Sequence, residues 1–275
     1  MNLTQQRFYG FQNTPFLWNG FLSELEQFES STELLSIREK VPNLTHDKSA
    51  IRLGNYVERL VSYALHQNCD IQILKENVQI ISNKVTLGEI DCLLLHSNQP
   101  VHLEIAYKFY LYDSSVGSTF LEHWIGPNRR DSLVLKINKV KNKQFPLLYS
   151  KECESLLSEL QLTIDDIQQK TYFKGQLYLP YGKEIEIELL NPDCVCGFYI
   201  NTNLLQKFSD CKFHIPKKLD WLIEPHVDVD WLNFEQLQQQ IEMFHQKESA
   251  PLCWLKQPNG EITKIFVVWW EIQTR

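Results

Sequence analysis

Two short segments of this sequence carry charged residues in otherwise apolar surroundings, at a spacing that suits chemistry. TLGEIDCLLL contains Glu89 and Asp91, and HLEIAYKFYL contains Glu104 and Lys108. Side chains alternate along a strand, so each pair would share one face. Charged groups inside a core are costly unless they pair, line a cleft or hold a cation. Oxygen ligands alone favour Mg²⁺ or Mn²⁺, and an ion pair between adjacent strands is the structural alternative.

Hydrophobic periodicity places these segments within a definite order of elements. Apolar residues recur every three or four positions over 47–66, which predicts a helix. The strands predicted after it cover 78–82, 86–96 and 101–112, and they are followed by a helix over 131–144 and a strand over 172–180. Because the links between the first three strands are short, we expect an antiparallel meander. The resulting order, α-β-β-β-α-β, belongs to an α/β or α+β protein.

The remaining sequence predicts a helical segment before this core and an α/β extension after it. A helix is expected over 21–40. Expected beyond residue 146 are a helix over 153–160, strands over 184–190 and 197–201, a helix over 233–245, and a hairpin of 251–257 with 262–271. The predicted domains are the N-terminal helical segment (1–46), the core (47–200) and a C-terminal extension packed on the core (201–275).

Composition and charge exclude several classes of protein. The chain has 275 residues, 43% of them hydrophobic, which excludes a disordered or collagenous protein. No apolar run approaches the roughly 18 residues of a membrane helix, and no export signal is visible, so we expect a cytoplasmic protein with no membrane partner. Seven irregularly spaced cysteines are expected to be reduced thiols. The net charge of -7 argues against a surface that coats nucleic acid as a whole and still allows a local basic site.

The two charged segments also carry a family resemblance. TLGEIDCLLLHSNQPVHLEIAYKFYL, followed by WIGPNRRDSLVLK, resembles the bacterial family named domain of unknown function 1853. Over about residues 47–180, the order of carboxylates and lysine is similar to that of the PD-(D/E)XK, or restriction-endonuclease-like, superfamily. The resemblance implies a restriction-endonuclease-like core and a Mg²⁺- or Mn²⁺-dependent nuclease that hydrolyses phosphodiesters in DNA or RNA.

This resemblance implies a role for particular residues. Asp91 and Glu104 would be the metal ligands, and Glu58 would match the glutamate that many members carry on the preceding helix. The superfamily lysine usually lies two residues after the second carboxylate, where this chain has Ala106. Lys108 is then the expected catalytic lysine. It lies farther along the strand from Glu104 than is usual, and either a β-bulge would restore the geometry or Lys136 of the next helix would take its place.

A basic segment follows the predicted strands and suits a phosphate backbone. Residues 129–151 contain seven basic side chains and one acidic side chain. A solvated helix face is the structural alternative for these charges. Gln144 resembles the glutamine of exonuclease-like members of the superfamily. The residues predicted to bind nucleic acid are Arg129, Arg130, Lys136, Lys139, Lys143 and Gln144.

Other chemistries have little support in the sequence. Cys194, Cys196, Cys211 and His214 do not have the usual spacing of a zinc knuckle, so we expect buried thiols and no zinc. Neither a Walker loop nor a dinucleotide fingerprint occurs, so no nucleotide cofactor is expected. A catalytically inactive module that binds nucleic acid or protein on the same fold remains the alternative to a nuclease. The sequence does not identify a protein partner.

Overall fold

The computed structural model describes residues 1–28 and 51–272 and shows a mixed α/β chain. Contacts divide the chain into two compact units, and β5, α3 and β7 contribute residues to both. The first unit comprises Phe16–Tyr107 and Leu135–Lys174, and the second comprises Met1–Pro15, Lys108–Val134 and Gly175–Arg275. The domain boundaries predicted after residues 46 and 200 stay a prediction.

The first unit is built on a meander of long strands. Its strands run in the order β3-β4-β5-β7, and β3, β4 and β5 pair antiparallel. Two-residue turns join them at Asn83–Lys84 and Ser97–Asn98, all four with positive φ, as the right-handed twist of a hairpin favours. The bounds are β3 Ile71–Ser82, β4 Val85–His96, β5 Gln99–Tyr112 and β7 Gln168–Pro180.

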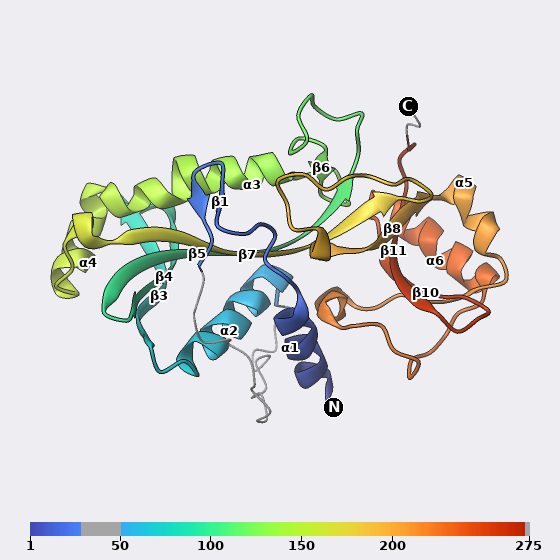
Figure 1. Ribbon diagram of the computed structural model, residues 1–275, viewed down its shortest axis with the longest axis horizontal. Helices are drawn as coiled ribbons and strands as arrows, with labels where there is room; N and C mark the ends of the chain where they lie inside the picture. Colours follow the sequence, from blue (N-terminus) through green and yellow to red (C-terminus); the bar gives the residue numbers. More distant parts are fainter. Residues whose placement is uncertain (29–50, 273–275) are drawn as a thin grey trace. The chain divides into compact units, whose positions relative to one another are not determined.

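Helices are drawn on both sides of these strands. Figure 1 shows α2 on one side of β3, β4 and β5, and α3 on the other. The helices are α2 Leu53–His66, α3 Leu133–Lys139 and α4 Glu154–Glu159. The apolar face of α2 is buried because its apolar residues recur at helical spacing. The observed order is therefore helix, three strands, helix and strand, with the two-residue β6 (Trp124–Ile125) before α3 and the short α4 between α3 and β7.

The helix after β6 changes its winding at its end. After α3 the backbone forms a π-helical turn over Val140–Gln144 and then a 3-10 turn over Phe145–Tyr149. A π turn adds one residue to the helical circuit and so re-aims the side chains that follow, and such turns are frequent at functional sites. Leu147 and Leu148 beyond it pack in a core with Ile90 and Leu93 of β4. This packing fixes where Gln144 lies.

The second unit has its own sheet and core. From β7 its strands run in the order β7-β8-β11-β10-β9, with β7–β8 and β8–β11 parallel and the other pairs antiparallel. Helix α6 packs its Leu237 and Ile241 into this core. Its elements are α1 Leu3–Asn13, β8 Val195–Asn201, α5 Thr202–Leu205, β9 Lys212–His214, α6 Phe234–His245, β10 Leu252–Lys256 and β11 Ile262–Val268.

Two predicted elements are wrong where the structure describes them. Phe21–Leu22 and Leu25–Glu26 form the short strands β1 and β2, not the start of a helix, because Ser23 and Glu24 turn the chain with positive φ. Residues 29–40 of that prediction, and 47–50 of the next helix, lie outside the described residues. The segment 184–190 is not a strand, although its residues alternate between acidic and apolar, because they do not join a ladder.

None of the helices in the described part of the chain has the length and apolar character that crossing a membrane requires.

Candidate active site

Asp91 and Glu104 lie side by side where two strands of the first unit stop pairing. The β4–β5 ladder ends at the pair Cys92 and Leu103. The next residue beyond that end is Asp91 on β4 and Glu104 on β5. Residues opposite each other in a sheet point to the same face. The Ile105 backbone N–H donates to Asp91 Oδ2 at 2.8 Å, so the carboxylate replaces a ladder bond at this point.

Both carboxylates are withdrawn from water. Glu104 is 1% exposed, and Asp91 is partly buried. Burial raises the pKa of Glu104 to about 7. Burial and, second, the adjacent Glu104 carboxylate raise the pKa of Asp91 to about 7. Two carboxyl groups in this position share a proton or a cation more readily than they carry two bare negative charges.

Lys136 supplies positive charge to this pair. Its Nζ donates to Gln144 Oε1 at 2.9 Å, and Gln144 Nε2 donates in turn to Glu104 Oε2. The ammonium of Lys136 also lowers the pKa values of Asp91, Glu104 and Glu58 against the larger effect of burial. One lysine therefore interacts electrostatically with three carboxyl groups.

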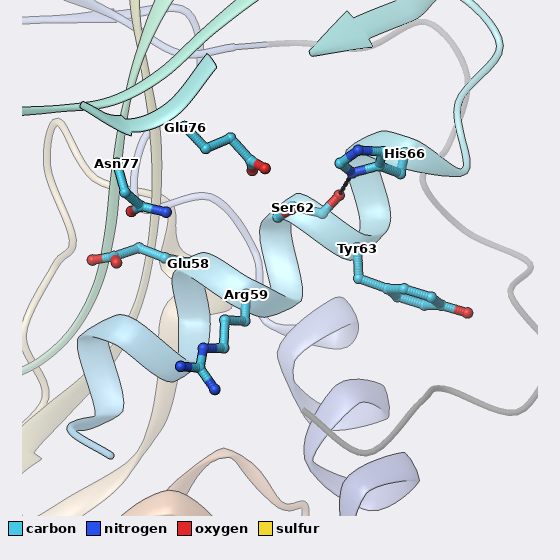
Figure 2. Close-up of a pocket in the computed structure, with 7 residues that line it drawn as sticks. All are labelled: Glu58, Arg59, Ser62, Tyr63, His66, Glu76 and Asn77. Carbon is cyan, nitrogen blue, oxygen red and sulfur yellow. Dashed lines mark hydrogen bonds between the residues drawn. The ribbon is translucent and has the colours of Figure 1, made fainter. Parts of the chain in front are cut away.

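Glu58 approaches the pair from α2. Burial, and then the charges of Asp91 and Glu89, raise the pKa of Glu58 to about 7. Glu58 also lines a pocket of about 400 Å³ between α2 and β3. Figure 2 shows the side chains of Glu58, Glu76 and Asn77 in the space between the helix and the strand.

The backbone of β3 is irregular beside Asp91. Glu76 pairs with Cys92 and Val78 with Ile90, which places Asn77 opposite Asp91. Asn77 has φ 53°, a left-handed conformation that is uncommon within a strand and that asparagine tolerates better than most residues. Such conformations persist where the surrounding structure imposes them, and they cluster at functional sites.

A histidine and a second glutamine complete the surroundings of Glu104. His102 Nε2 lies 2.9 Å from Glu104 Oε1, and its Nδ1 lies 3.0 Å from Gln169 Nε2. The His102 ring is fully buried, and burial lowers its pKa to about 4. Neither His102 nor Gln169 is among the residues predicted from the sequence. The signal for His102 was present, because strand parity places it on the face of Glu104.

Three of the predicted residues belong to the second unit. Lys108 Nζ is 2.6 Å from Asp131 Oδ2. Arg129 pairs with Asp113 at 2.7 Å, and its guanidinium lies 4.6 Å from the centre of the Trp270 ring. Arg130 and Glu248 are 3.9 Å apart and both well exposed. The structure therefore brings together Glu58, Asp91, Glu104, Lys136 and Gln144 in the first unit, while Lys108, Arg129 and Arg130 have partners in the second.

The other basic residues of the predicted nucleic-acid surface are on the first unit. Lys139 and Lys143 are exposed. Lys141 between them pairs with Glu24 at 3.0 Å. Lysines at such exposed positions are available to phosphates, and they are also ordinary for a solvated helix face.

Across 1–28 and 51–272, no group of three or more His, Cys, Asp and Glu side chains is arranged to hold a metal ion. A pair of carboxylates would be a partial ligand set for Mg²⁺, because this ion keeps several waters and takes further ligands from substrate phosphates. His214 Nδ1 lies 3.1 Å from the Asp230 carbonyl, and Cys196 Sγ lies 3.3 Å from the Cys194 carbonyl.

Comparison with known proteins identifies the family of this chain. No curated protein and no solved structure matches the chain. The family model described as Domain of unknown function (DUF1853) matches residues 7–268, which is nearly the whole chain. The chain therefore belongs to the DUF1853 family.

Proposed function

We propose that this protein is a Mg²⁺-dependent nuclease built on a restriction-endonuclease-like core. The observation that carries the proposal is the pair of carboxylates, the partly buried Asp91 and the buried Glu104, at the point where the pairing of β4 and β5 ends. The order of the main elements, α2, β3, β4, β5, α3 and β7, supports the proposal because the superfamily resemblance implies helix, three strands, helix and strand, although β6 and α4 are additional. Mn²⁺ would serve in place of Mg²⁺, because both prefer oxygen ligands.

Asp91 and Glu104 would hold the cation. When bound, Mg²⁺ would polarise the phosphodiester and lower the pKa of an attacking water. The surrounding hydrogen bonds keep both side chains in place, since Ile105 N–H holds Asp91 and Gln144 holds Glu104. The raised pKa values of Asp91 and Glu104 indicate that two free negative charges are unfavourable here, and a bound cation would offset those charges.

Lys136 takes the role of the catalytic lysine in this proposal. It interacts with all three carboxyl groups of the first unit's site, whereas Lys108 is bound to Asp131 in the second unit. An ammonium fixed by Gln144 stabilises the negative charge that develops on a phosphate during attack. Glu58 of α2 interacts electrostatically with Asp91, and it would accept a proton from the attacking water.

The substrate would be DNA or RNA. Exposed Lys139 and Lys143, on the segment that carries Lys136 and Gln144, suit contacts with phosphates that flank the cleaved bond. Such contacts read no sequence, so binding should weaken steeply as salt rises.

A cleavage assay tests the proposal. Purified protein is incubated with Mg²⁺ or Mn²⁺ and with single-stranded, duplex and branched DNA and RNA. We expect at least one substrate to be cut, and we expect Asp91→Ala and Glu104→Gln to remove the activity. Absence of cleavage with every substrate, or cleavage that survives Asp91→Ala, would contradict the proposal.

A catalytically inactive module that binds nucleic acid or protein on the same fold is the second candidate. It is favoured by the hydrogen bonds of Glu104, because both of its oxygens already accept from side chains. Calorimetry with Mn²⁺ separates the two candidates. Cation binding that Glu104→Ala abolishes favours the nuclease, whereas salt-dependent binding of nucleic acid without cation binding favours the module.

A further inference from the structure

Glu104 is held on both sides by a continuous chain of side-chain hydrogen bonds. On one side, Lys136 donates to Gln144, which donates to Glu104 Oε2. On the other, His102 lies 2.9 Å from Oε1 and is itself contacted by Gln169. His102 and Glu104 are 0% and 1% exposed, so water does not substitute for these partners.

The hydrogen bonds of Gln169 fix the tautomer of His102. Gln169 Nε2 donates to the Phe145 backbone carbonyl at 2.8 Å, and a carbonyl can only accept. The same nitrogen faces His102 Nδ1 at 3.0 Å, so Nδ1 must accept and carries no proton. The ring proton is therefore on Nε2, where it donates to Glu104. The Phe145 ring packs edge-on against the imidazole, with ring centres 5.5 Å apart, and restricts its rotation.

We propose that His102 is a positioning residue, which holds the Glu104 carboxylate through its Nε2–H in the orientation that a divalent cation requires. This inference rests on the proposed function, because it needs Glu104 to be a cation ligand. Outer hydrogen bonds of this kind orient a ligating side chain, and their loss typically weakens metal binding. The neutral ring donates a hydrogen bond and adds no positive charge beside the cation.

The π turn also contributes to the orientation of Glu104. Val140–Gln144 leads directly into Phe145, so one short segment sets the Gln144 side chain, the Phe145 carbonyl and the Phe145 ring. Through Gln144, and through Gln169 with His102, that segment sets the hydrogen bonds that Glu104 accepts from Gln144 and from His102. Glu104 is thus oriented by the helix end as well as by its own strand.

Mn²⁺ binding by isothermal calorimetry tests this inference on the full chain. His102→Leu removes the donor and keeps a similar apolar volume, and we expect it to raise the Kd for Mn²⁺ about 10- to 100-fold. His102→Gln places an amide N–H near the position of Nε2 and should restore most of the affinity. His245→Gln is the control, because the His245 ring lies in the second unit against the Val267 backbone carbonyl, and it should leave the Kd unchanged.

Two further measurements cover the case in which His102→Leu does not fold. Gln169→Met removes the donor that fixes the tautomer and should also raise the Kd. The ¹⁵N spectrum of the wild-type histidines should show His102 with a protonated Nε2 and an unprotonated Nδ1. A protonated Nδ1 would overturn the inference and leave the proposed function standing. The same conclusion would follow if the His102 and Gln169 variants bound Mn²⁺ with the wild-type Kd while Asp91→Ala abolished binding. Absence of Mn²⁺ binding in the wild-type protein would overturn both.

Discussion

Replacing Asp91 with asparagine should stabilise the metal-free protein at pH 8. The wild-type carboxylate is partly buried and lies against Glu104, and its pKa is raised to about 7. The amide introduced by Asp91→Asn would keep an oxygen for the Ile105 N–H and would place an N–H donor beside Glu104. The substitution therefore removes an unfavourable charge and keeps the hydrogen bond.

The expected gain follows from the pKa of Asp91. A rise from 3.8 to about 7 is a shift of about three units, and each unit corresponds to 1.36 kcal/mol, so ionisation costs at most ~4 kcal/mol. The folded state binds the proton more tightly than the unfolded state, so this cost is absent below about pH 4, grows up to pH 7 and is complete at pH 8. Because Glu104 shares the same proton, we expect Asp91→Asn to gain about 2–4 kcal/mol at pH 8.

Urea unfolding of metal-free protein at pH 4.5 and pH 8 measures this gain. Asp113→Asn is the matched control, because burial raises the pKa of Asp113 but hydrogen bonds from Ser115 and Arg129 lower it by more. That variant should lose stability at pH 8. Mn²⁺ at about 100 times its Kd should stabilise the wild-type protein by ~2.7 kcal/mol, and this increment should vanish in Asp91→Asn. If Asp91→Asn is no more stable than wild type at pH 8, or gains equally at both pH values, the assignment of a strained carboxylate pair is wrong.

Three further predictions test other parts of the structure. Lys136→Met should lower the rate of Mg²⁺-dependent cleavage by about 10²–10³-fold, whereas Lys108→Met should have a much smaller effect. A single-turnover assay measures both rates, and a larger loss in Lys108→Met than in Lys136→Met would return the catalytic role to Lys108. Lys84→Gly should raise the free energy of unfolding by about 0.5–1 kcal/mol, because Lys84 has φ 67° in the β3–β4 turn, and a loss of stability in urea would contradict that turn type. Gly197→Ala should lower the free energy of unfolding by about 1–3 kcal/mol or more, because the new Cβ would collide with the Lys264 carbonyl on β11. An unchanged Tm would show that β8 and β11 are less closely packed than described.

The local sequence pattern was sufficient to predict the central strands of the first unit. The predicted strands over 86–96 and 101–112 differ from β4 and β5 by two residues or fewer at each end, because apolar residues and turn residues mark them clearly. Strand β3 begins at Ile71, seven residues before its prediction, since its polar edge residues hide the pattern. The segment 184–190 has the alternation of a strand and no ladder, which sequence periodicity does not distinguish.

The site was predictable only in part, for a physical reason. Strand parity places Asp91 and Glu104 in two charged segments, which is a local property, and the family resemblance is what pairs them as ligands. The choice between Lys108 and Lys136 depends on how a helix packs against the sheet, and the π turn that aims Gln144 leaves no mark in the sequence. Gln169 reaches His102 from a strand 67 residues away along the chain, a distance over which no local pattern extends.

Anomalous diffraction from crystals soaked in Mn²⁺ at pH 8 tests the central claim most directly. The proposal predicts one strong peak between the carboxylates, with oxygens of both Asp91 and Glu104 about 2.0–2.2 Å from the ion and Lys136 beside it. The peak should be absent in crystals of Asp91→Asn. A wild-type crystal with no peak at this position, or with Mn²⁺ bound only elsewhere on the chain, would contradict the claim that these carboxylates form a cation site.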